Sequence, residues 1–140
     1  MDRSRVEGGV PLTVKLRLTS TSSGRPISGG EVRLWHCDGD GSLAGSDANG
    51  WVTFTSVFPA TEAGRWPHLH FEVAGRPAAQ LALPGDACVQ AYSAEAYGES
   101  KRNLARSSPA DALRDGMSLE MASVTGDVDR GFVATRMVGV

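Results

Sequence analysis

Hydrophobic and polar residues alternate along much of the chain with the period of two that is typical of β-strands. Segment 12–18 shows this most clearly, with leucine or valine at every second position and threonine, lysine or arginine between them. Such alternation predicts a strand that buries one face and exposes the other. Alternation, or enrichment in β-branched and aromatic residues, predicts further strands. The predicted strands are 12–18, 31–37, 51–57, 67–73, 79–83, 118–124 and 131–138.

Turn-forming residues separate these segments. A polar, glycine-rich loop is expected over 38–50, ending in Asn49-Gly50, the dipeptide most typical of a hairpin. Ser108 and Pro109 are the residue types of an N-cap and a first helical position, which predicts one short helical turn. Many short strands with frequent turns favour an all-β fold, an antiparallel β-sandwich with at most one short helix. The length suits a single domain over 1–140, with a flexible N-terminal arm over 1–10.

Composition and charge exclude several classes of function. The chain has 14 basic and 16 acidic residues, a net charge of −2 and no concentration of positive charge, so we expect no nucleic-acid partner. No apolar run is long enough to cross a membrane and the first residues have no secretory signal, so the expected location is cytoplasmic. In that compartment Cys37 and Cys88 are expected to be reduced and buried.

Two of the three histidines, His68 and His70, lie two residues apart in a predicted strand. Side chains at i and i+2 of a strand share a face, so the two imidazoles should lie side by side, with Leu69 and Phe71 facing the other way. Neutral imidazole is a good ligand for iron, zinc, copper and nickel. A packed or hydrogen-bonded pair on a sheet is the alternative. The third histidine, His36, follows the apolar face of its own strand and is expected in the core rather than in a ligand set.

A series of short segments, spread from Pro11 to the C-terminus, has a specific order and spacing. The segments are 12–18, Gly24-Arg25-Pro26-Ile27-Ser28-Gly29-Gly30, Glu31-Val32-Arg33-Leu34-Trp35-His36-Cys37-Asp38, Asn49-Gly50-Trp51-Val52-Thr53-Phe54, Phe58-Pro59, Gly64-Arg65-Trp66-Pro67-His68-Leu69-His70-Phe71 and Gln80-Leu81. Together they resemble the intradiol ring-cleavage dioxygenases, the superfamily of the catechol and protocatechuate dioxygenases. The resemblance implies a β-sandwich whose loops hold one non-heme ferric ion, bound by two tyrosinates and two histidines.

The resemblance assigns roles to four residues that this chain retains. The two histidine ligands correspond to His68 and His70. The family arginine that lies close to the substrate and stabilises negative charge corresponds to Arg65, and the glutamine of the following strand corresponds to Gln80. Gln80 is therefore expected to donate a hydrogen bond in the site.

Both tyrosine ligands are replaced. The first family tyrosine corresponds to Leu43, which cannot bind a metal, and the second corresponds to Glu62. The chain's own tyrosines, Tyr92 and Tyr97, lie in a later segment, and no motif places either of them in the metal site. Without two phenolates to stabilise Fe(III) and to accept the catechol proton, ordinary intradiol cleavage of catechol is expected to be absent or very weak.

Two interpretations of the altered site follow. In the first, Glu62, His68 and His70 form the two-histidine, one-carboxylate set of many Fe(II) oxygenases. In the second, no metal is bound, and the pocket serves a cyclase or isomerase of secondary metabolism through acid–base groups, or merely binds a small molecule. Either way the expected ligand is a small aromatic or polyketide-derived metabolite, the expected cleft lies where Leu43, Glu62 and the histidine strand meet, and a homodimer is a reasonable expectation.

Overall fold

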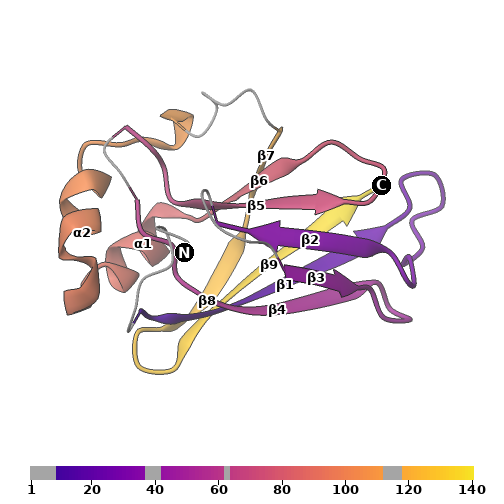
Figure 1. Cartoon of the computed structure of the whole chain (residues 1–140), viewed down its shortest axis with the longest axis horizontal. Coiled ribbons are helices and arrows are strands. Elements are labelled where there is room, and N and C mark those ends of the chain that lie inside the picture. Colours follow the sequence, from indigo (N-terminus) through magenta and orange to yellow (C-terminus); the bar gives the residue numbers. More distant parts are fainter. Residues whose placement is uncertain (1–8, 37–41, 62–63, 112–117) are drawn as a thin grey trace.

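Two β-sheets pack face to face in the computed structural model, which describes residues 9–36, 42–61, 64–111 and 118–140 (Figure 1). The four-stranded sheet has the order β4 (Trp51–Val57), β1 (Pro11–Thr19), β9 (Gly131–Gly139), β8 (Ser123–Asp127). The five-stranded sheet has the order β3 (Ser42–Gly45), β2 (Glu31–Trp35), β5 (His68–Val73), β6 (Ala79–Ala82), β7 (Ser118–Met121). Strand pairs β1–β9 and β6–β7 are parallel, and the others are antiparallel. The all-β sandwich predicted from the sequence is confirmed.

The core lies between the two sheets and follows the alternation that predicted the strands. In β1 the leucines and valine of the apolar face are fully buried, whereas Lys15 on the other face is exposed. In β5 the inward side chains are Leu69, Phe71 and Val73, all buried in the same apolar cluster. Because side chains alternate along a strand, His68 points to the outer face of the five-stranded sheet, away from this core.

The chain passes between the sheets at two places that the sequence did not predict. The predicted strand 118–124 is two strands, because the chain leaves the five-stranded sheet after β7 and enters the four-stranded sheet at β8. An ion pair of 2.6 Å between Arg136 of β9 and Glu120 of β7 joins the sheets beside this crossing. Asn49-Gly50 likewise forms a turn between β3 and β4 in different sheets, not a hairpin. Gly50 has a φ of 85°, and a Cβ there would collide with the carbonyl oxygen of Leu18.

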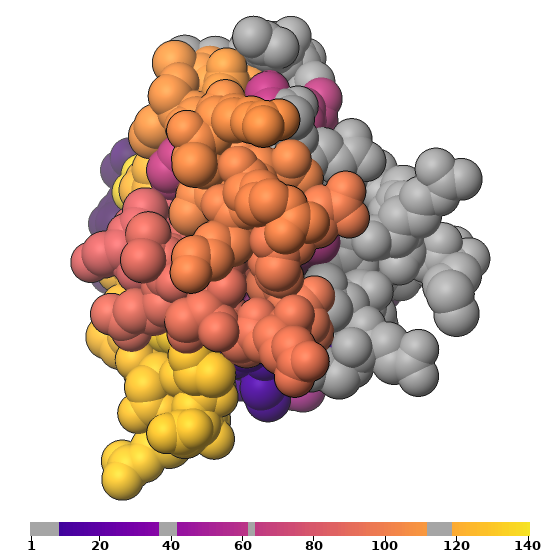
Figure 2. Space-filling view, turned by 90° about the vertical axis from the view of Figure 1, so that its left-hand side faces the viewer, coloured from indigo at the N-terminus to yellow at the C-terminus, as the bar shows by residue number. Residues whose placement is uncertain are grey.

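Two short helices occupy one end of the sandwich, beside the segment that leads into β5 (Figure 1). They are α1 (Gly85–Ala91) and α2 (Gly98–Leu104), joined through a 3₁₀ turn, η1 (Glu95–Tyr97). Figure 2 shows that residues of this helical segment form much of that end face. The sequence led us to expect at most one short helix, because seven-residue helices are too short for a clear periodic pattern. The turn predicted after Ser108 is present as a 3₁₀ turn over 109–111, with the Asp111 carboxylate accepting the Ser108 N–H at 2.8 Å.

The start of the chain is more firmly held than expected. Val10 is buried, its N–H donates to the Tyr97 hydroxyl at 3.0 Å, and its carbonyl accepts the Phe58 N–H at 2.8 Å. The expected flexible arm therefore does not extend to Val10, and its first eight residues lie outside the described part of the chain. Cys37 and Glu62 also lie outside it. No helix among the described residues is long and apolar enough to cross a membrane, and the cytoplasmic location stays a prediction.

Candidate functional site

The imidazole pair, His68 and His70, lies on the outer face of β5 as the sequence predicted. The two ring centroids are 4.9 Å apart and the ring planes are inclined at 79°. Both side chains are almost fully buried, with exposed fractions of 3% and 8%. Burying polar rings costs free energy, and a buried pair of titratable rings is a candidate for a functional site.

The His68 ring is held in one tautomer. Its Nδ1–H donates to the Trp66 carbonyl at 2.5 Å, so in the neutral ring the lone pair lies on Nε2. Trp66 is itself fixed, because its indole Nε1–H donates to the Leu83 carbonyl at 2.7 Å. Trp66 packs with Ala82, Leu104 and Leu119 in a small apolar cluster beside His68. This is the arrangement that metal-binding histidines commonly have: one nitrogen bonded to a carbonyl and the other directed to the ligand.

The His70 ring lies against an aromatic neighbour that the sequence analysis did not single out. Trp35 is the cross-strand partner of His70, and the two rings are stacked, with centroids 5.4 Å apart and planes inclined at 13°. The guanidinium of Arg33 lies over the Trp35 ring, 4.4 Å from the ring centroid. The sequence does carry a signal for this contact, since an Arg-x-Trp pair in a strand places both side chains on one face.

Gln80 is paired with the histidine strand, whereas Arg65 precedes that strand in the chain. Gln80 of β6 is directly across from His70 and is fully buried, so the predicted strand does bring it to the pair. Arg65 is half-buried in the segment just before β5. Their roles in the site stay predictions.

The segment that carries Glu62 and Arg65 is anchored by α2. The Thr61 N–H donates to Ser100 Oγ at 3.1 Å, and the Asn103 amide donates to the Thr61 carbonyl at 3.0 Å. The Thr61 hydroxyl also donates to the Arg65 carbonyl at 2.7 Å, which ties the two ends of this segment together. Glu62, the proposed third ligand, lies outside the described residues, but the residue before it is fixed by three hydrogen bonds.

Leu43 lies in a strand and not in the loop that the sequence analysis expected. It lies in β3, at the edge of the five-stranded sheet, and its side chain is 65% exposed. It shares the outer face with Arg33, its cross-strand partner. Two strand spacings and two residues separate Leu43 from His70, about 12 Å between Cα atoms by ordinary sheet dimensions. A strand within segment 38–50 was not predicted, and whether Leu43 borders the cleft stays a prediction.

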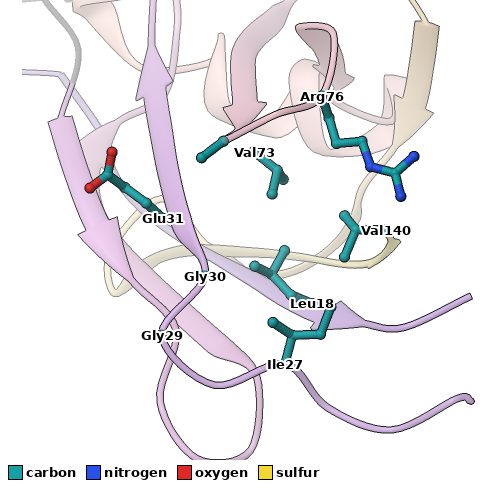
Figure 3. A pocket seen from close by; sticks show the side chains of 9 residues that line it. Leu18, Ile27, Gly29, Gly30, Glu31, Val73, Arg76 and Val140 are labelled. Carbon is teal, nitrogen blue, oxygen red and sulfur yellow. The ribbon is translucent and has the colours of Figure 1, made fainter.

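A separate groove of about 490 Å³ lies at the end of the sandwich where β5 finishes. Figure 3 shows apolar side chains of Val73, Leu18 and Val140 in its floor, with Glu31 and Arg76 on opposite sides. The six-residue strand β5 places this end about 17 Å from His68. Of the predicted site residues that the structure describes, none lines this groove.

Solved structures similar to this chain are dioxygenases. The intradiol ring-cleavage dioxygenase of Tetranychus urticae aligns with a TM-score of 0.74 and 17% identity, over 99% of this chain and 86% of that one. The dioxygenase domain of a carbohydrate-binding fusion from Streptomyces sp. SirexAA-E aligns with a TM-score of 0.60 and 22% identity, over 99% and 87%. The 3-chlorocatechol 1,2-dioxygenase of Rhodococcus opacus 1CP aligns with a TM-score of 0.57 and 16% identity, over 95% of this chain and 60% of that one. No protein-family model and no curated protein matches the chain.

The chain has the fold of the intradiol ring-cleavage dioxygenases. The alignments cover almost all of it, which agrees with the resemblance found in the sequence. At these identities the likeness establishes the fold, and the chemistry has to be argued from the side chains.

Both tyrosines of this intradiol fold are structural. Tyr92 and Tyr97 are the only tyrosines in the chain, both are buried, and their rings stack with centroids 5.3 Å apart. The Tyr92 hydroxyl donates to the Pro59 carbonyl and the Tyr97 hydroxyl to the Phe58 carbonyl, each at 2.7 Å. Burial raises the pKa of Tyr97 to about 12 and raises that of Tyr92 well above its ordinary value. Neither is placed to serve as a phenolate ligand.

The remaining titratable candidates are structural too. His36 is buried between the sheets, and its Nε2 lies 2.9 Å from Ser56 Oγ of β4, so the expectation of a core histidine is confirmed. Cys88 is buried and unpaired, and burial, with a smaller contribution from Asp86, raises its pKa to about 12. Such a thiol is inert rather than nucleophilic.

The donor set fits half of the iron site implied by the resemblance. The imidazole pair offers two adjacent nitrogen ligands, with the nitrogen of His68 defined by its bond to Trp66. The two phenolates have no counterpart, since every tyrosine hydroxyl is engaged elsewhere. Within the described residues no third histidine, cysteine or carboxylate joins the pair in a metal-binding cluster. The side chains therefore fit a metal held by two histidines and do not fit a tyrosinate-bound ferric ion.

Proposed function

We propose that this protein is a divergent enzyme of the intradiol dioxygenase fold, a non-heme iron oxygenase with an altered ligand set. In this proposal His68 and His70 bind the metal, Glu62 supplies the anionic oxygen ligand in place of a tyrosinate, and the substrate is a small aromatic or polyketide-derived metabolite. The observation that carries the proposal is the buried imidazole pair with its tautomer fixed on the Trp66 carbonyl.

The chain's own residues have separate tasks in this proposal. A metal ion on the pair would supply Lewis-acid activation of bound substrate or oxygen. Arg65 holds an anionic oxygen of the substrate, and Gln80 donates a hydrogen bond to it from the position across from His70. The apolar cluster around Trp66 excludes water from the side of His68, which strengthens both polar interactions. With both tyrosines engaged in the fold, catechol is not expected to be cleaved at an ordinary enzymatic rate of about 1 per second or more.

A metal-free enzyme, a cyclase or isomerase of secondary metabolism, is the second candidate. It is supported by the loss of the phenolate ligands that the resemblance implies, because both tyrosine hydroxyls are bonded to main-chain carbonyls. In that case His68 and His70 act as acid and base on a bound organic substrate. A binding protein without catalysis is the third candidate. The substrate-conversion experiment described below distinguishes it from the two enzymes.

The test is a metal inventory of the protein as purified, together with variants that keep side-chain volume. The wild type should retain iron, and His68→Gln, His70→Gln and Glu62→Gln should lose it. His36→Asn, which alters the remaining histidine in the core, is the matched control and should retain iron. Equal iron in the wild type and in His68→Gln would remove the pair from the ligand set.

Oxygen consumption and substrate conversion, measured with small aromatic or polyketide-derived compounds, distinguish the three proposed functions. The oxygenase requires iron and consumes oxygen. Conversion of substrate by metal-free protein without oxygen would establish the cyclase or isomerase, and binding without conversion in either condition would establish the binding protein.

A further inference from the structure

Three side chains form a layered stack that leads from the surface to the imidazole pair. Arg33, which is exposed, lies over one face of the Trp35 ring at 4.4 Å, and His70, which is buried, is stacked on Trp35 at 5.4 Å. Arg33 and Trp35 are two residues apart in β2, and His70 is the cross-strand partner of Trp35 in β5. The stack therefore follows directly from strand register and needs no loop to assemble it.

We propose that Trp35, held in place by Arg33, is the positioning residue for His70. It fixes the plane of the His70 ring so that both imidazoles face one common ligand. This inference rests on the proposed function where the ligand is a metal, but the orientation of His70 can be tested without any metal.

The physical need for such a residue comes from the freedom of the histidine ring. The terminal torsion of histidine has a broad distribution, so a ring is oriented only when a neighbour restrains it. His68 has its restraint in the hydrogen bond to the Trp66 carbonyl. Trp35 gives His70 a restraint of another kind, since two rings inclined at only 13° resist rotation of either one. The two histidines are thus oriented by two different tryptophan residues, one through its carbonyl and one through its ring.

Trp35 is itself restrained by a second neighbour. A guanidinium stacks well on an indole ring, and the guanidinium of Arg33 lies over the Trp35 ring, 4.4 Å from its centroid. Arg33 is exposed, so it acts on His70 only through Trp35 and is not itself in the site.

The other sheet offers a matched pair for comparison. Arg17 of β1 and Trp51 of β4 are cross-strand partners, with the guanidinium 5.7 Å from the ring centroid. Both side chains lie on the outer face of the four-stranded sheet, on the opposite side of the sandwich from His70. Removing Trp51 therefore removes an arginine-stacked tryptophan of the same type without touching the imidazole pair.

The experiment uses the full chain with Trp35→Leu, Trp35→Phe and Arg33→Met, and with Trp51→Leu as the control. The first readout is the NMR shift of the His70 ring protons in metal-free protein, assigned by comparison with His70→Gln. A stacked indole shifts these protons through its ring current, so Trp35→Leu should move them while leaving those of His36 in place. Trp35→Phe should restore part of the shift, and Trp51→Leu should change nothing.

The second readout is the affinity for Cu²⁺ alone, measured by calorimetry and corrected by the binding that remains in His68→Gln/His70→Gln. Loss of a residue that orients a metal ligand typically weakens affinity by 10–100-fold. We expect about a 10-fold loss in Trp35→Leu, a smaller loss in Arg33→Met, recovery in Trp35→Phe and no change in Trp51→Leu.

His70 ring shifts that stay at wild-type values in Trp35→Leu would overturn the proposal. If Trp35→Leu does not fold by circular dichroism, Trp35→Phe and Arg33→Met decide the question by the same ring shifts. A wild type without specific Cu²⁺ binding would count against the proposed metal site, while the ring shifts would still establish or overturn the role of Trp35. The two failures are therefore distinguishable.

Discussion

The imidazole pair and the tyrosine pair are two sets of buried, neighbouring rings with opposite surroundings. His68 and His70 lie on the outer face of the five-stranded sheet, with ring centroids 4.9 Å apart. Tyr92 and Tyr97 lie in the core at the helical end, with centroids 5.3 Å apart. Each tyrosine hydroxyl donates to a main-chain carbonyl of the loop after β4, whereas the Nδ1–H of His68 donates to the Trp66 carbonyl just before its own strand.

In the proposed function, this difference separates the fold from its chemistry. The resemblance implies two histidines and two tyrosines around one metal, and this chain has the adjacent histidines but uses both tyrosines in its core. The tyrosines hold the carbonyls of Phe58 and Pro59, in the loop that leads to Glu62. Their phenols therefore stabilise the segment that carries the proposed replacement ligand and do not take part in the site.

Alkaline pH should give the largest effect, a loss of stability that comes from the tyrosine pair. The pKa of Tyr97 is raised to about 12 and that of Tyr92 higher still, both mainly by burial, whereas an unfolded tyrosine titrates near 10. Below pH 10 both states are protonated and the phenols give no pH dependence. Above pH 10 only the unfolded chain loses these protons, so the free energy of unfolding should fall by about 1.4 kcal/mol per pH unit for each phenol, until Tyr97 titrates in the fold near pH 12. Urea unfolding at pH 9, 10 and 11 measures this slope.

The variant Tyr92→Phe/Tyr97→Phe is the control, since it removes every tyrosine of the chain. Its slope should be shallower than that of the wild type above pH 10. A smaller slope should remain from about pH 9, because burial raises the pKa of Cys88 to about 12 from 9.0. Equal slopes in the wild type and the double variant would show that the phenols are not protonated and buried as described.

Tyr97→Phe alone should destabilise the protein at neutral pH. The Tyr97 hydroxyl accepts the Val10 N–H and donates to the Phe58 carbonyl, and both groups lose this partner while the ring is kept. Leaving buried polar groups unsatisfied costs about 1–3 kcal/mol each. For these two groups, urea unfolding at pH 7 should give a loss of about 2–6 kcal/mol, and iron content per folded chain should not change. Loss of iron in this variant would contradict the structural role of the tyrosine pair.

The sequence predicts most of the sandwich because a strand with one buried face has alternating apolar and polar residues. This alternation shows both where the strand lies and which side chains face the core. β1 and β4 are found within one residue of their predicted bounds, and the faces of His68 and Leu69 follow from the same rule. The sequence does not predict where the chain changes sheets. Nothing in the alternation over 118–124 marks the break between β7 and β8, since both sides of the crossing have strand-like residues.

The site could be predicted only as far as its residues share a strand or a motif. His68, His70 and Gln80 are brought together by antiparallel pairing, which the order of strands suggests. The contacts from Ser100 and Asn103 to Thr61 connect residues about 40 positions apart, and helices of seven residues give no periodic signal from which to place them. Trp35 was missed for a simpler reason, because its role depends on register between β2 and β5 and not on its own strand alone.

Among these variants, His70→Gln should change the free energy of unfolding least. It therefore gives the clearest contrast between the imidazole pair and the tyrosine pair. Glutamine has a similar volume and remains polar, so the expected loss is the two ring contacts of His70, with Trp35 and with His68, about 1–2 kcal/mol in total. A residue kept for function is often not the one that would be chosen for stability. The expected result is a free energy of unfolding near that of the wild type together with complete loss of iron, the reverse of Tyr97→Phe. A loss of 3 kcal/mol or more, about the upper cost of one unsatisfied buried group, would place His70 with the structural residues instead.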